Sequence, residues 1–331
     1  YKRQQQDGIV FGSDFERFSF RVNMDNDINK WLTTGLRASV ARTKQTNSVD
    51  GSGAIYNALN QLPEVPARNP DGSFGMQTEN MYGTYFSNPL SDLIQNENYS
   101  RSTQVYVNAF ADIKLWKGLV FRTEYAANYN YNTGYRFTPS YDYEFFKQQS
   151  SASRSAGNGS NWTLKTYLTY NGTFGKHNVS VMAGHEAQEN NWESLDGSRT
   201  NFLFNSVHEL NAGDATTAKA NSSRGSSAIE SYFGRLNYNF ADRYLLTATL
   251  RADGSSSFAK ESRWGWFPSV ALAWKVNNEA FLKDVEAINS LKLRLGWGVV
   301  GNQWAGSYAY GVTMALSLIH ISEPTRLDVI S

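Results

Sequence analysis

The sequence contains no cysteine among its 331 residues, which excludes a disulfide framework, a thiolate metal site and a cysteine nucleophile. Its formal net charge is only +1, so it lacks the basic excess that is typical of nucleic-acid binding proteins, and we expect no nucleic-acid partner. The four histidines follow no metal-binding spacing, and we expect no metal ion and no cofactor. No apolar run approaches the roughly 18 residues that a membrane-spanning helix requires.

Charged residues are also scarce, at 18% of the chain, whereas aromatic residues reach 14%. This combination is unusual for a soluble enzyme. It fits a membrane β-barrel, whose outer face is apolar and ringed by Tyr, Trp and Phe. The mean hydropathy of −0.50 does not contradict a barrel, because lumen residues and loops dilute the apolar positions.

The two ends of the chain look foreign to the rest. Residues 316–326 resemble the translation of a transposon adapter from sequencing libraries, and Tyr1-Lys2-Arg3-Gln4 resembles the reverse complement of the same adapter's end. We therefore expect residues 1–4 and 316–331 to derive from the adapter. Residues 5–315 are then the segment that carries the fold.

Apolar and polar residues alternate with period two through most of this segment. In residues 119–131, for example, Phe121 and Tyr125 share one face of a strand, while Arg122 and Glu124 share the other. A period of two predicts β-strands. Such runs predict about ten strands of about ten residues, at 15–25, 31–42, 102–114, 119–131, 162–174, 178–188, 229–240, 243–253, 264–275 and 290–299.

Twelve charged residues of these predicted strands fall opposite the apolar series. They are Arg21, Arg37, Asp112, Arg122, Glu124, Lys165, Glu186, Arg235, Arg251, Lys275, Lys292 and Arg294. A Lys or Arg on the lipid side at mid-bilayer costs about 2–4 kcal/mol, so we expect selection to have removed charged residues from that face. A soluble antiparallel sandwich also alternates, but its strands are usually shorter, at about 5–6 residues.

The connections alternate in length as well. Short connections are expected at 25–30, 114–118, 174–178 and 240–243, and long polar ones at 43–101, 132–160 and 189–228. This pattern is typical of a membrane barrel with tight turns on one side and long loops on the other. Two connections deviate, a shorter loop at 254–263 and a longer turn at 276–289 with one or two helical turns. The Ser/Gly/Asn-rich stretch 151–160 is expected to be a mobile loop.

Four motifs in residues 231–303 resemble the late barrel of the SusC/RagA group of TonB-dependent transporters. They are Y-F-G-R-x-N-Y at 232–238, R-x-D-G-S-S-x-F at 251–258, W-G-x-F-P-S at 264–269 and L-K-L-R-x-x-W-G-x-x-G-N-Q at 291–303. The resemblance implies an all-β fold, a transmembrane antiparallel up-and-down barrel of 22 strands in the bacterial outer membrane. About ten of those strands would belong to this chain, and the plug domain and the TonB-contacting segment would lie outside it.

The same resemblance implies a function and partners. It implies active, TonB-dependent uptake of oligosaccharides or peptides across the outer membrane, together with a SusD-like lipoprotein that acts as a lid. A passive porin and a soluble all-β glycan-binding module are the alternatives. An enzyme is not expected, because no nucleophile and base are clustered in the sequence.

Two groups of residues are candidates for function. External-loop aromatics could stack on substrate or contact the lid; they are Tyr82, Tyr85, Phe86, Tyr141, Tyr143, Phe145 and Trp192. Alternatively, these rings pack the loops against each other, which is the commoner role of aromatic side chains. The resemblance also implies that charged residues inside the barrel contact the plug; the candidates are Arg122, Glu124, Lys165, Glu186, Arg235, Arg251 and Arg294.

The loop carboxylates are weaker candidates. Asp71, Asp92, Glu97 and Asp142 could bind substrate or Ca²⁺, although the Asn-Pro-Asp-Gly run at 69–72 is more simply a turn. Arg251 and Asp253 end a predicted strand on the same face, so we expect them to form an ion pair.

Overall fold

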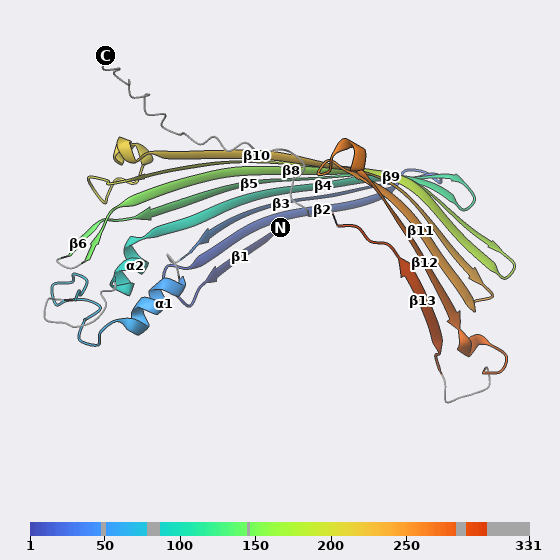
Figure 1. Cartoon of the computed structure of the whole chain (residues 1–331), viewed down its shortest axis with the longest axis horizontal. Coiled ribbons are helices and arrows are strands. Elements are labelled where there is room, and N and C mark those ends of the chain that lie inside the picture. Colours follow the sequence, from blue (N-terminus) through green and yellow to red (C-terminus); the bar gives the residue numbers. More distant parts are fainter. Residues whose placement is uncertain (48–50, 78–86, 144–145, 283–288, 303–331) are drawn as a thin grey trace, which may run out of the picture.

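The computed structural model describes residues 1–47, 51–77, 87–143, 146–282 and 289–302. In these residues eleven strands form one antiparallel sheet, in which strands follow each other in chain order, and two further short strands form a separate hairpin. The sheet is an open, curved wall with its first and last strands at the two edges (Figure 1). No helix among the described residues is long and apolar enough to cross a membrane.

The sheet consists of β1 (Lys2–Asp7), β2 (Asp14–Asp27), β3 (Leu32–Thr46), β4 (Glu97–Trp116), β5 (Leu119–Thr138), β8 (Ser151–Phe174), β9 (His177–Thr200), β10 (Lys219–Phe240), β11 (Tyr244–Ser255), β12 (Trp264–Lys275) and β13 (Lys292–Gly298). The other elements are the hairpin β6 (Tyr141–Tyr143) and β7 (Phe146–Gln148), the helices α1 (Gly51–Asn60) and α2 (Pro89–Gln95), and the 3-10 turns η1 (Leu210–Ala212), η2 (Ala215–Thr217), η3 (Lys260–Ser262) and η4 (Val276–Asn278). All ten predicted strands are present. β1 is additional and includes three of the four residues that we expected to derive from the adapter.

Five strands are about one and a half to two times as long as the alternation predicts. β4 and β5 have 20 residues each, β8 and β9 have 24, and β10 has 22. The prediction of a mobile loop at 151–160 is therefore wrong, because this stretch is the first part of β8. Both of its faces are polar, so no hydrophobic alternation marks it, and pairing with β5 and β9 on either side holds it in the sheet.

The short connections are confirmed. Gly118 and Gly175 occupy the turns after β4 and β8 with φ of 81° and 60°, a conformation that two-residue hairpin turns require and that glycine adopts without strain. All four short turns lie at one end of the sheet. At the other end, the three long connections shrink to 47–96, 139–150 and 201–218, because the lengthened strands take up their flanking residues.

The strand register divides the side chains between two faces, since directly paired residues in a sheet point to the same side. One continuous row runs from Asp112 through Arg122, Tyr167, Gly184, Phe233 and Arg251 to Phe267. All twelve charged residues named above lie on the face of this row, which we call the ionic face. The opposite side, the apolar face, carries the row Phe121, Leu168, Ala183, Gly234, Leu250 and Pro268.

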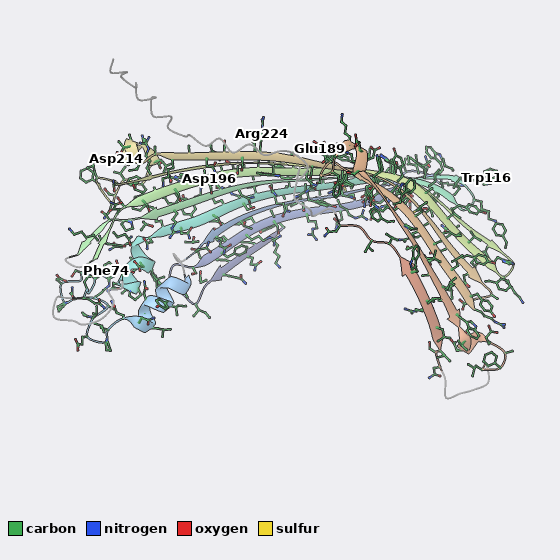
Figure 2. The ribbon with its side chains drawn as sticks, viewed as in Figure 1. Phe74, Trp116, Glu189, Asp196, Asp214 and Arg224 are labelled. Atoms are coloured by element: carbon green, nitrogen blue, oxygen red, sulfur yellow. The ribbon has the colours of Figure 1, made fainter. Side chains whose placement is uncertain are left out.

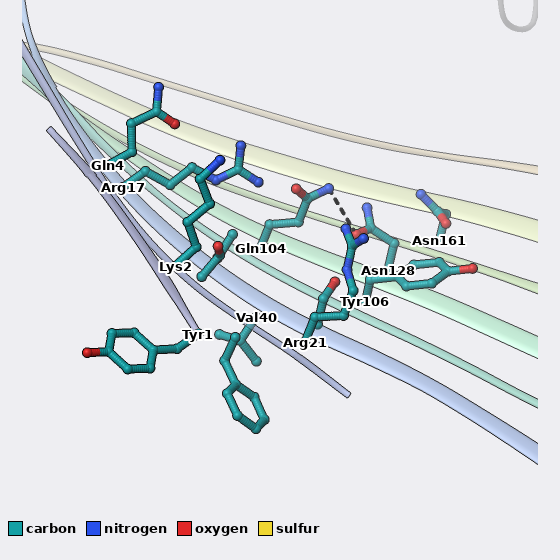
Figure 3. A pocket seen from close by; sticks show the side chains of 14 residues that line it. Tyr1, Lys2, Gln4, Arg17, Arg21, Val40, Gln104, Tyr106, Asn128 and Asn161 are labelled. Carbon is teal, nitrogen blue, oxygen red and sulfur yellow. Dashed lines mark hydrogen bonds between the residues drawn. The ribbon is translucent and has the colours of Figure 1, made fainter. Parts of the chain in front are cut away.

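The ionic face lies on the concave side of the wall. Arg224, whose side chain belongs to the opposite face, points away from β10 on the convex side (Figure 2). A hollow of about 770 Å³ is lined by polar side chains of the ionic face, including Arg17, Arg21, Gln104 and Asn128 (Figure 3). Gln104 donates a hydrogen bond to Asn128 across β4 and β5 at 3.2 Å.

The apolar face is apolar over only part of each long strand. The apolar stretch covers Trp162–Tyr170 in β8, Tyr232–Phe240 in β10 and Tyr244–Ala252 in β11, about nine residues each, the length with which a tilted strand crosses a bilayer core. Beyond this band, β8, β9 and β10 continue for about ten residues with polar side chains on both faces, a rise of roughly 30 Å or more. We call this part of the sheet the outer wall.

A small aromatic core stabilises the tip of the outer wall on its convex side. Phe137 is 1% exposed and packs edge-on against Phe202, with ring centroids 5.6 Å apart. Tyr135 and Ala152 are buried beside it. The connection 201–218 therefore folds back onto β5 and β8 and covers apolar residues that would otherwise be exposed outside the membrane.

The two faces can be tested with adjacent residues of β12. Val270 and Ala271 are both apolar and exposed, but Val270 lies on the apolar face and Ala271 on the ionic face. We expect Val270→Arg to cost about 2–4 kcal/mol and to reduce the folded protein in the outer membrane, because its charge meets lipid. Ala271→Arg should assemble normally. Heat-modifiable mobility in gel electrophoresis measures the folded fraction, and equal losses for both variants would contradict the assignment of the faces.

Candidate functional site

The first charged cluster of the ionic face surrounds Arg122. Its NH1 lies 3.2 Å from Asp112 Oδ2, and its Nε lies 3.4 Å from Glu124 Oε2. Asn108 donates to Glu124 Oε1 at 2.7 Å, and the guanidinium carbon lies 4.0 Å from the ring centroid of Phe110. Arg122 is shared by two carboxylates and also rests against an aromatic ring, so ion pairing and a cation–π contact stabilise the cluster although its side chains are largely covered.

The second cluster is centred on Glu186 and links four neighbouring strands. Lys165 Nζ lies 2.9 Å from Glu186 Oε2, and Arg251 NH2 lies 3.2 Å from Glu186 Oε1. Arg251 also bonds Asp253 Oδ1 through Nε at 2.6 Å and Ser231 Oγ through NH2 at 2.9 Å. The ion pair expected between Arg251 and Asp253 is thus present. Glu186 is only 15% exposed and has cationic partners on both sides, as a half-buried carboxylate requires.

The motif at 251–258 has a structural role. A Cβ on Gly254 would lie 2.8 Å from the indole of Trp264, so only glycine lets this ring pack on the strand end. Ser256 N–H donates to the carbonyl oxygen of Ala228, and Ser256 Oγ accepts from the N–H of Ala228, both at 2.9 Å. These bonds extend the pairing of β10 with β11 past the strand end and fix the connection to β12.

The structure thus brings five of the seven candidate residues of the ionic face into the two clusters. Arg235 and Arg294 lie on the same face with exposed side chains, in neither cluster. Asn108 and Ser231 complete the clusters but were not predicted. They are neutral residues on strands, and only the register between β4 and β5, or between β10 and β11, reveals that they face a charge.

A further cluster, which sequence reasoning missed, lies at the short-turn end. The side chain of Glu279 is buried after η4, where its Oε1 accepts from Tyr244 Oη at 2.8 Å and from Trp274 Nε1 at 3.0 Å. Arg243 NH1 lies 3.0 Å from Glu279 Oε2. The hydrogen bonds from Trp274 and Tyr244, with the charge of Arg243, hold the pKa of Glu279 below its ordinary value.

Asp242 makes a second anchor beside it. Lys275 Nζ lies 2.5 Å from Asp242 Oδ1, and Asn278 donates to the Asp242 backbone carbonyl at 2.8 Å. The hydrogen bond from Lys275 is the main cause of a lowered pKa for Asp242. The connection that follows β12 is therefore tied at two points to the turn between β10 and β11.

The structure places the predicted loop aromatics in different environments. Tyr82, Tyr85, Phe86 and Phe145 lie outside the described residues, and only the backbone of Tyr143 is described, in β6. Tyr141 is buried, which fits packing within the loops. The assignment of Trp192 to a loop is wrong, because Trp192 lies within β9, on the ionic side of the outer wall. No apolar alternation surrounds it, and the sequence therefore gave no strand signal there.

The loop carboxylates have local roles. Asp71 Oδ1 accepts from the N–H of Ser73 at 2.9 Å, which confirms the turn at 69–72. Burial raises the pKa of Asp92 in α2, and Glu97 Oε1 lies 3.5 Å from His208 Nδ1. The side chain of Asp142 lies outside the described part. Across the described ranges, no three His, Cys, Asp or Glu side chains gather into a metal-holding group.

A curved meander with a bilayer-length apolar band outside and a charged face inside defines the wall of an outer-membrane β-barrel. Residues 43–317 match the protein family described as TonB dependent receptor-like, beta-barrel. The chain belongs to this family, a family of outer-membrane receptors and transporters rather than enzymes.

Its curated relatives agree with this assignment. The chain is 31% identical over 312 residues to TonB-dependent receptor P3 of Formosa agariphila, covering 92% of this chain and 31% of that protein. It is also 31% identical over 333 residues to TonB-dependent receptor SusC of Bacteroides thetaiotaomicron, covering 92% and 32%. The predicted SusC/RagA resemblance is confirmed, and the chain spans about a third of the length of these relatives.

Among solved structures, the chain resembles the RagAB peptide importer in its open-open state. The TM-score is 0.76 at 22% identity, with 89% of this chain and 33% of that chain covered. This similarity confirms the fold of the barrel wall.

The Glu186 cluster can be tested with a neutral isostere in the full-length protein. Glu186→Gln leaves Lys165 and Arg251 without their shared carboxylate, and we expect the free energy of unfolding to fall by about 1–3 kcal/mol. Glu64→Gln makes the same chemical change at an exposed loop position and should have no effect. Thermal unfolding followed by heat-modifiable mobility measures both, and an unchanged midpoint for Glu186→Gln would contradict a stabilising cluster.

The Glu279 anchor predicts a pH dependence. A carboxylate with a lowered pKa stabilises the fold above its unfolded pKa, about 4.3, and this contribution disappears as the pH falls through the lower folded value. Glu279→Gln should therefore lower the thermal midpoint at pH 7, and the difference from wild type should shrink towards pH 3.5. A difference that is constant with pH would show that the charge of Glu279 does not matter.

Proposed function

We propose that the full-length protein is a TonB-dependent importer of oligosaccharides or peptides that works with a SusD-like lipoprotein lid. The family membership supports receptor and transport function in general. The finer proposal is supported by analogy with RagAB, which is named a peptide importer.

The observation that carries the proposal is the ionic face. A channel for passive diffusion needs an open polar lumen. In this wall the charged groups of the two clusters are bonded to charged neighbours on the same face, and Arg235 and Arg294 are exposed on the concave side. We infer that a plug domain fills the space on the concave side of this wall. The exposed arginines and the outermost side chains of the two clusters would contact this plug. An importer needs such a plug so that substrate passes only when TonB delivers energy.

The open edges of the sheet support a larger barrel. The outer sides of β1 and β13 have no strand partner in the described residues, and unpaired backbone groups in lipid cost several kcal/mol each. Further strands are therefore needed on both edges before this wall can exist in a membrane. This requirement disfavours the soluble glycan-binding module, whose sheet would have no bilayer-length apolar band to bury.

Energy dependence separates the importer from the passive porin. Cells that express the full-length protein should accumulate labelled oligosaccharide or labelled tryptic peptides, and a protonophore such as CCCP should stop the accumulation because TonB draws on the proton gradient. Cells that express a general porin are the control and should equilibrate with the label in the presence of CCCP. Uptake that persists unchanged with CCCP would exclude the importer.

A further inference from the structure

We propose that Trp192 is a stacking platform for a pyranose ring of a neutral oligosaccharide, on the concave side of the outer wall. The inference rests on the proposed import function and narrows its substrate class. It concerns a place outside the membrane band, where an incoming substrate meets the wall before it reaches the charged clusters below.

The backbone around Trp192 lets its indole lie flat. In the register of the sheet, Trp192 stands between Gly159 of β8 and Gly225 of β10. A Cβ on Gly225 would lie 2.7 Å from the indole carbon Cε2 and 2.8 Å from Nε1, so the ring occupies the space above this glycine. An indole that rests on the sheet in this way presents its other side to the lumen, and Trp192 is 51% exposed.

Two other aromatic rings of the ionic face lie beside the guanidinium group of an arginine. Phe110 lies under the guanidinium of Arg122 at 4.0 Å, and Phe233 lies 5.8 Å from that of Arg251. The exposed Trp264 and Trp266 belong to the apolar face at the rim of the lipid band. Trp192 differs from all of these because its position serves neither the lipid boundary nor a charged cluster.

The residues around Trp192 on the same face are neutral and can form hydrogen bonds. Asn190 and Ser194 flank it along β9, and Ser223 and Ser227 flank Gly225 along β10. Ser194 Oγ lies 2.8 Å from Ser223 Oγ. A flat aromatic face bordered by amides and hydroxyls matches a sugar ring, whose C–H groups are apolar on one side and whose hydroxyls form the rim.

The same surroundings argue against a peptide at this place. Peptides carry charged termini and commonly charged side chains. The neighbours of Trp192 on this face of β9, Asn190 and Ser194, are neutral and offer no counter-charge. The charged residues of the face lie further along β9, at Glu186 towards the membrane and Asp196 towards the tip. A neutral saccharide binds here without leaving a charge unpaired.

The test measures binding of a defined panel to the full-length protein in detergent, by isothermal titration calorimetry. The panel consists of maltohexaose, laminarihexaose, xylohexaose and mannohexaose, with a tryptic casein digest as the peptide probe. For the hexasaccharide that binds, Trp192→Ala should weaken binding about ten-fold or more, while Trp192→Phe should stay within about three-fold because it keeps a stacking face. Gly225→Ala should also weaken binding, since its Cβ would lift the indole.

Trp116→Ala is the matched control, because Trp116 is exposed at the opposite end of the sheet and should leave binding unchanged. Heat-modifiable mobility confirms that each variant is folded. If the wild type binds a hexasaccharide and Trp192→Ala binds it equally well, the platform is wrong while the importer stands. If the wild type binds no hexasaccharide of the panel, the inference is overturned, and the CCCP experiment decides separately whether the protein is an importer.

Discussion

The hydrogen-bond ladder between neighbouring strands is the constraint on which this structure depends. Inside a bilayer no water can satisfy a backbone amide, so each strand must pair on both sides along its whole buried length. In the described residues the ladder runs unbroken from β1 to β13, with one irregularity between Lys114 and Trp116 at a turn. The register that this ladder fixes decides which side chains meet lipid and which meet the interior.

The charged clusters follow from that register. Lys165 and Glu186 are direct cross-strand partners, and Arg251 reaches the same carboxylate from two strands away. No short sequence window contains all three residues, yet a sheet without a register shift places them together. The clusters also restrain the register in return, since a slip by one residue would turn every charge towards lipid. Ladder and ion pairs therefore specify the same arrangement.

The sequence predicts the membrane band of this fold well and the outer wall poorly. All ten expected strands exist, and the charges of 119–131 and 162–174 lie on the predicted face, because lipid imposes a strict alternation that can be read directly. Outside the band both faces meet water, so stretches such as 151–160 have the composition of a loop. The position of Trp192 was misjudged for the same reason. Contacts such as Glu279 with Tyr244 join distant residues, and no spacing rule reveals them.

The outer wall raises the question of what holds it as a sheet. Gly157, Gly159 and Gly225 are poor strand formers, and no apolar face drives this part of β8 to β10 together. Backbone hydrogen bonds between neighbouring strands must therefore hold the outer wall together. It is anchored at one end by the membrane band and at the other by the core around Phe137. A sheet held only at its two ends can keep small, neutral residues between them. Because these residues need not pack against another layer, there is room for the exposed indole of Trp192 over Gly225. The side chains on this face can therefore be suited to a ligand rather than to a buried core.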